Sequence, residues 1–103
     1  MNYDFSDDWF SANIPLFEKF LGGLKGRRCR LLEIGSYQGR SVVWLLENIA
    51  THPSSCLDTI DAYENSRLRP NLAATCWPEK VAFHLGTSAF VLRTLPLDSY
   101  DFA

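Results

Sequence analysis

The 103-residue sequence has no long apolar run, no large basic cluster and no closely spaced pair of cysteines. A helix that crosses a bilayer needs about 20 consecutive apolar residues, so we do not expect a membrane protein. Ten Lys and Arg residues stand against twelve Asp and Glu, which gives a net charge of −2. A nucleic-acid-binding surface calls for the opposite balance. The sequence thus predicts neither a membrane nor a nucleic acid as partner.

Cysteine is scarce as well. Cys29, Cys56 and Cys76 are odd in number, lie far apart and form no C-x-x-C motif. No signal-type segment precedes them, so free thiols in a reducing cytoplasm are the simplest interpretation. The Cys, His, Asp and Glu residues also lack the spacing of metal ligands. We therefore predict a cytoplasmic protein without a bound metal.

The sequence does contain enough apolar residues for a core. Hydrophobic residues make up 47% of it and include seven phenylalanines, a composition that argues against disorder. Its length fits one small domain over residues 1–103. Within that domain we distinguish an N-terminal helical arm at 1–25 from a β/α core at 26–103.

The core is organised around residues 31–49. Leu31, Leu32 and Ile34 form a short apolar run, typical of a parallel strand that is covered on both faces. Gly35 and Gly39 follow and allow a tight turn with a close backbone approach to a ligand. From Ser41 the apolar residues fall at helical spacing. A strand, a glycine turn and a helix start place N–H groups and a positive helix end at the strand tip, which predicts a small-molecule site.

The spacing of the glycines narrows the choice of ligand. A dinucleotide site would show G-x-G-x-x-G, and a phosphate loop would end in Gly-Lys-Ser/Thr. Here the spacing is E-x-G-x-x-x-G, with Glu33 two residues before Gly35. This stretch resembles motif I of the class I S-adenosylmethionine (SAM)-dependent methyltransferases. The D-W-F-S-x-N-I-P run at 8–15 and residues 41–48 extend the resemblance to the O-methyltransferase-type branch. An α/β turn without a ligand is the alternative.

The resemblance implies an α/β, Rossmann-like three-layer fold that is truncated, since it covers only about the first half of a family member. We expect parallel strands near 29–35, 56–61 and 81–85 in the order 3-2-1. A short fourth strand at 100–103 would lie beside the first. A strand that is apolar on both faces but open at one edge needs cover, so we expect a homo-oligomer or a completing partner chain.

The family pattern also implies a set of SAM contacts. The loop would hold the methionine end of SAM, Glu33 would orient the amino end or the loop, and Asp61 would accept hydrogen bonds from the ribose. The turn after the third strand would lie near the adenine edge. The predicted cofactor-binding residues are Glu33, Gly35, Ser36, Tyr37, Gly39, Ser41, Asp61, Gly86, Thr87 and Ser88.

Asp61 and Ser88 of this set also have an ordinary structural interpretation, and two neighbouring polar residues are not assigned to the site. Asp61 ends the second strand 22 positions after Gly39, the distance of a ribose-binding acid, but it could simply cap that strand. Ser88 could equally be a helix N-cap. Asp58, inside the second strand, is expected to face solvent. His84 is expected to be packed or half-exposed rather than to act as a base.

The N-terminal arm raises a similar choice. Asn13 can cap a helix that carries Pro15 in its first turn. We favour simple packing of this helix on the sheet. In relatives of the pattern such a segment lies across the ligand cleft, and Trp9 and Phe10 would then contact substrate.

Two classes of function remain. The first is a SAM-dependent methyltransferase that acts on a small molecule at oxygen, with this chain as its cofactor-binding half. The second is a non-catalytic methyltransferase-like fold that serves binding, regulation or oligomerisation. The sequence singles out no catalytic base, although Tyr37, Arg40 and His84 are available.

Overall fold

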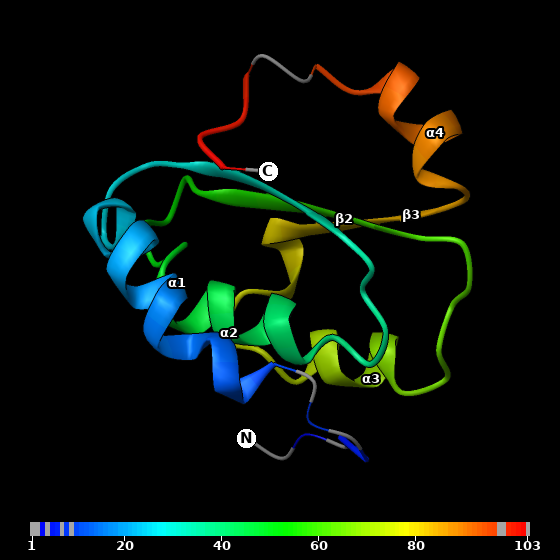
Figure 1. Cartoon of the computed structure of the whole chain (residues 1–103), viewed down its shortest axis with the longest axis horizontal. Coiled ribbons are helices and arrows are strands. Elements are labelled where there is room, and N and C mark those ends of the chain that lie inside the picture. The colour runs from blue at the N-terminus through cyan, green and yellow to red at the C-terminus, as the bar shows by residue number, and fades with distance from the viewer. Residues whose placement is uncertain (1–2, 4, 7, 9, 97–98, 103) are drawn as a thin grey trace.

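The computed structural model describes residues 3, 5–6, 8, 10–96 and 99–102. A three-stranded sheet forms the middle layer, with α2 and α3 on one face and α4 and the C-terminal segment on the other (Figure 1). The strands are β1 (Arg30–Ile34), β2 (Cys56–Asp61) and β3 (Val81–Leu85). The helices are α1 (Ile14–Leu21), α2 (Arg40–Asn48), α3 (Leu68–Ala73) and α4 (Ser88–Val91). Short 3-10 turns lie at Ser11–Asn13, Gly22–Leu24, Pro78–Lys80 and Leu92–Thr94.

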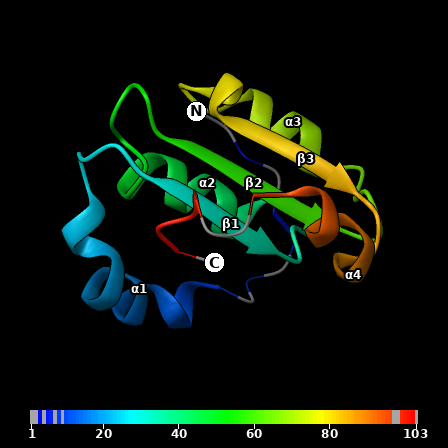
Figure 2. The ribbon, with the colours of Figure 1, turned by 90° about the horizontal axis from the view of Figure 1, so that it is seen from above.

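The sheet confirms the predicted fold class. All described pairings between strands are parallel, and the order β1-β2-β3 is the expected 3-2-1 seen from the other edge (Figure 2). The predicted fourth strand is reduced to one parallel bridge between Leu31 and Phe102. Two backbone hydrogen bonds support it: Leu32 N–H donates to Phe102 at 2.9 Å, and Asp101 N–H donates to Arg30 at 2.8 Å. The tail thus lies beside the outer edge of β1.

The two faces of the sheet bury very different amounts of apolar surface. Leu31 and Leu57 are completely or almost completely buried against α2, the helix that also supplies Val42 and Leu46 to this core. The opposite face has a small cluster in which Leu32 and its neighbours on β2 and α4 are covered by the C-terminal segment. β1 is therefore buried on both faces at Leu31 and Leu32, as expected for a parallel strand in the middle layer, whereas Ile34 at its end is exposed.

The start of α1 differs from the prediction. Asn13 precedes the helix, but its side chain makes no capping hydrogen bond. Asp8 instead accepts N–H groups of Phe10 at 3.1 Å and Ser11 at 2.7 Å. The 3-10 turn ahead of α1 moves the unsatisfied N–H groups toward the N-terminus, so an earlier acid caps them. Pro15 does occupy the first turn of α1.

The two glycines of the loop between β1 and α2 are constrained differently. Gly35 has φ +92° and Gly39 has φ +88°, backbone angles that residues with a side chain rarely adopt. A Cβ on Gly39 would lie 3.0 Å from Leu68 Cδ1, whereas one on Gly35 would meet nothing within 4 Å. We expect Gly39→Ala to lower the free energy of unfolding by about 2 kcal/mol and Gly35→Ala by about 1 kcal/mol. Urea denaturation measures both, and equal losses would contradict the role of the Leu68 contact.

Candidate functional site

The carboxyl ends of the three strands meet at one edge of the sheet. Gly35 N–H, just past β1, donates to Ile60 at 2.7 Å, and Gly86 N–H, just past β3, donates to Asp61 at 2.9 Å. The loops that follow the strands therefore start side by side (Figure 2). Ligands of open parallel sheets bind at this edge, so the fold brings the predicted residues to a suitable place.

Asp61 ties this edge to the glycine loop. Its Oδ2 accepts the Tyr37 N–H at 3.0 Å, and its Oδ1 accepts the Tyr63 N–H at 3.2 Å. Tyr37 has φ +45°, an uncommon value for a residue with a side chain. A carboxylate oxygen has room for more than one donor, so Asp61 can hold the loop and still accept hydrogen bonds from a ligand. Asp61 is therefore more than a cap at the end of β2, because it also holds the glycine loop.

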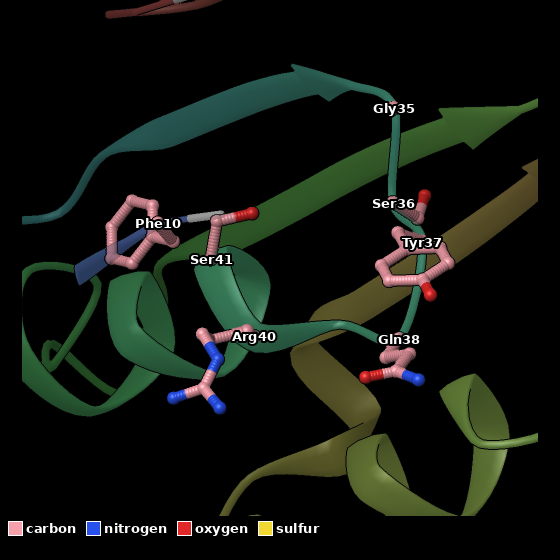
Figure 3. Close-up of a pocket in the computed structure, with 7 residues that line it drawn as sticks. All are labelled: Phe10, Gly35, Ser36, Tyr37, Gln38, Arg40 and Ser41. Atoms are coloured by element: carbon pink, nitrogen blue, oxygen red, sulfur yellow. The ribbon is translucent and has the colours of Figure 1, made fainter. Parts of the chain in front are cut away.

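A cavity of about 300 Å³ opens at the turn between β1 and α2 (Figure 3). Its walls combine the backbone of the glycine loop, the first turn of α2 and one ring from the N-terminal arm. The lining residues are Phe10, Gly35, Ser36, Tyr37, Gln38, Arg40 and Ser41. Four predicted cofactor-binding residues are among them. Gly39 is not, because it turns toward Leu68 and packs the loop on α3.

The side chains of the loop are largely engaged within the protein. Ser36 is 2% exposed, and its hydroxyl pairs with that of Thr59 at 2.5 Å. Gln38, equally buried, accepts the Ser6 N–H at 2.8 Å and donates to the Ser6 hydroxyl at 2.6 Å. Backbone groups, the exposed Tyr37 side chain and the first turn of α2 are therefore what the loop offers a ligand. Sequence reasoning did not place Gln38 in the site, since nothing in the motif specifies that position.

Glu33 lies beside the loop cavity and does not line it. Ser41, at the start of α2, donates to Glu33 Oε1 at 2.6 Å. Burial raises the pKa of Glu33 from its usual 4.5 to about 7, and the hydrogen bond from Ser41 opposes this shift only in part. Of the two roles predicted for Glu33, the structure shows how it can orient the loop, namely by holding Ser41.

Comparison with known proteins agrees with this fold. No protein-family model matches the chain, and no curated protein matches it. The crystal structure of a presumed O-methyltransferase from Klebsiella pneumoniae superposes with a TM-score of 0.68 at 22% sequence identity. The chain has a methyltransferase fold. The match covers 88% of this chain and 40% of the Klebsiella protein, so the chain spans well under half of that neighbour.

The turn after β3 stands outside the loop cavity in this methyltransferase fold. Gly86, Thr87 and Ser88 do not line it, although Gly86 is bonded to the β2 end through Asp61. Thr87, not Ser88, is the N-cap of α4, and its hydroxyl accepts the Phe90 N–H at 3.3 Å. The helix starts one residue later than a Ser88 cap requires, which places Ser88 in the first turn. Contact of these residues with a cofactor stays a prediction.

The N-terminal arm both packs and reaches the cavity. Phe10 is 7% exposed and packs against Phe17 and Trp44, with ring centroids 5.0 and 5.7 Å apart. The same ring lines the loop cavity (Figure 3). The arm therefore packs against α2 through these rings, and Phe10 is also placed where a ligand could touch it. Trp9 lies outside the described residues.

A polar network occupies the opposite face of the sheet, where sequence reasoning expected Asp58 to face solvent. That expectation is wrong. Asp58 accepts from Tyr100 at 2.5 Å, pairs with His84 Nε2 at 2.8 Å and lies 3.7 Å from an Arg30 nitrogen. Burial and the bond to Asp58 raise the pKa of Tyr100 to about 12. The network joins the three strands to the tail, and His84 is packed in it as predicted.

The described residues hold neither a metal-binding cluster nor a membrane-spanning helix. Among them, no group of three or more His, Cys, Asp or Glu side chains could hold a metal ion. No helix in the described part of the chain is long and apolar enough to cross a membrane.

Proposed function

We propose that this chain binds SAM, or its product S-adenosylhomocysteine, at the carboxyl ends of β1 and β2. The observation that carries the proposal is the contact of Asp61 with the Tyr37 N–H at the rim of the loop cavity. It joins the ribose-binding acid predicted for β2 to the loop predicted for the methionine end. The likeness of the fold to an O-methyltransferase supports the same assignment.

The residues present fit such a ligand. An added Cβ on Gly35 would meet no protein atom within 4 Å, so the backbone there is open to close approach. The first turn of α2 lies at the cavity and suits a carboxylate. Asp61 would accept hydrogen bonds from the ribose hydroxyls. Glu33 would act through Ser41 as a positioning residue for the start of α2.

The reaction that follows from this assignment is methyl transfer to a small molecule at oxygen. SAM supplies an activated methyl group on its sulfonium sulfur. The part that this chain plays is to bind and orient that cofactor and to keep water from it. The second candidate function is a methyltransferase-like binding module without catalysis. Methyl transfer by the purified chain, measured with radiolabelled SAM and a panel of small alcohols and phenols, decides between the two.

Calorimetric titration with S-adenosylhomocysteine tests the binding proposal. We expect Asp61→Ala to weaken the affinity at least about tenfold, because two ribose hydrogen bonds are lost. Gly35→Val should weaken it as much, since a side chain would enter the ligand space at a strained φ. Glu79→Gln, an exposed position on the turn before β3, serves as the control and should bind like the parent chain. Unchanged affinity in both site variants, or no binding by the parent chain at millimolar ligand, would refute the proposal.

A further inference from the structure

A second hollow, of about 270 Å³, lies at the opposite end of α2 from the loop cavity. One wall is the C-terminal half of α2 with the chain that follows it, and the other is the chain between α3 and β3. The lining residues are Leu46, Glu47, Thr51, Thr75, Cys76 and Trp77. The loop cavity lies at the first turn of α2 and shares none of these residues. The hollow is therefore a separate candidate site.

Trp77 offers this hollow a ring that the fold holds in place. The ring is 45% exposed, and Lys80 Nζ lies 5.1 Å from its centroid. Lys80 is itself buried and donates to the carbonyl oxygens of Ala50 at 2.8 Å and His52 at 2.7 Å. These bonds fix the ammonium group, and a fixed cation beside the ring restrains it through their mutual attraction. An exposed aromatic ring that is already ordered can stack on a ligand at a small entropic cost.

Glu47 places a hydrogen-bond acceptor on the α2 wall of the hollow. Its Oε1 accepts the hydroxyl of Tyr3, so this carboxylate already binds an O–H group carried by an aromatic ring. Among the described residues, none donates to Glu47 Oε2. The hydroxyls of Thr51 and Thr75 are both engaged by backbone groups. The polar group that the hollow offers a ligand is therefore an acceptor, and it calls for a ligand with a donor.

We propose that this hollow binds a planar aromatic molecule with one N–H or O–H donor, the chemistry shared by indoles and phenols. The ring stacks on Trp77 and packs against Leu46, and the donor bonds to Glu47 Oε2. The volume is just below the range for drug-sized ligands, which suits a ligand of one or two fused rings. The site uses neither the loop cavity nor the edge of β1, and it does not depend on the proposed binding of SAM.

Titration of the full chain with indole, followed by NMR in the absence of SAM, tests the proposal. N-methylindole has the same ring but no N–H, and it should bind at least about fivefold more weakly. Glu47→Leu removes the acceptor from an exposed helix position. It should weaken indole binding by a similar factor and leave N-methylindole binding unchanged.

The stacking part of the proposal is tested with the same two ligands. Trp77→Leu should weaken both of them at least about fivefold, because the stacking surface is lost. Phe20→Leu is the matched control, since Phe20 on α1 is also an exposed ring with a lysine beside it. It should change the binding of neither ligand. Equal effects of these two variants would contradict stacking on Trp77.

Protection of a thiol supplies an independent readout of where indole binds. Cys76 lines the hollow and is exposed, whereas Cys56 does not line it. Saturating indole should slow the alkylation of Cys76 by iodoacetamide at least about threefold, because access limits the reaction of a thiol. Alkylation of Cys56, measured in the same samples by mass spectrometry, should not change. Equal binding of indole and N-methylindole, an unprotected Cys76, or no binding of indole at about 5 mM would each overturn the proposal.

Discussion

The Glu33→Gln variant should be more stable than the parent chain above pH 7, by up to about 3 kcal/mol. The reason is the raised pKa of Glu33, which moves from 4.5 in the unfolded chain to about 7 in the folded one. Below pH 4.5 the carboxyl group is neutral in both states and costs nothing. Between these two values the unfolded chain ionises first, so the folded parent loses stability as the pH rises. Gln stays neutral throughout and escapes this loss.

Urea denaturation of both proteins at about pH 4.5 and about pH 8 measures the effect. The two chains share every other titrating group, so the change in their stability difference between the two pH values isolates Glu33. Glu79→Gln, whose side chain is exposed, should show no such change. A stability difference that is the same at both pH values would mean that Glu33 is not desolvated in the folded chain.

Substitution of Ile34 by lysine should shift the chain toward a monomer. We propose that two copies of the chain associate through the outer edge of β1. In the described structure this edge is paired with the tail only at Arg30 and Leu32, and Ile34 at its end is 56% exposed. An open strand edge with an apolar side chain promotes pairing with another chain, and a lysine opposes it. Ile34→Lys should therefore weaken self-association at least about tenfold.

Size exclusion with light scattering over a range of concentrations measures this equilibrium. Leu16→Lys is the matched control, because Leu16 is 53% exposed but lies on α1. It should leave association unchanged. A parent chain that stays monomeric at micromolar concentration would reject the homo-oligomer, and equal effects of both lysines would place the interface elsewhere. A hetero-partner would then have to be sought as the cover of this edge.

The elements around the glycine loop could be predicted from the sequence because their signals are local. The apolar run of β1, the two glycines and the helical spacing after Ser41 each depend on neighbours in the chain. The predicted bounds of β2 and β3 agree with the structure, and β1 is one residue shorter at each end than predicted. The position of Asp61 beside the loop was also predictable, since parallel pairing brings the ends of β1 and β2 to one edge.

Other features depend on contacts between residues far apart in the sequence. The partners of Asp58 come from β1, β3 and the tail, and no local pattern in the CLDTID strand distinguishes an inward acid from a solvated one. The capping acid of the N-terminal arm depends on how the chain enters α1.

The sequence by itself determined the strand and helix segments of the core and the glycine turn, because backbone conformation and hydrophobic spacing act over a few residues. The parallel order of the strands was predicted from the resemblance to the methyltransferase family. Only the tertiary structure decided the electrostatics of Glu33. Its pKa depends on how completely α1, α2 and the tail exclude water from the edge of β1 and on whether they bring a counter-charge. Desolvation is a property of the assembled surroundings, and it has no signature in the order of residues along the chain.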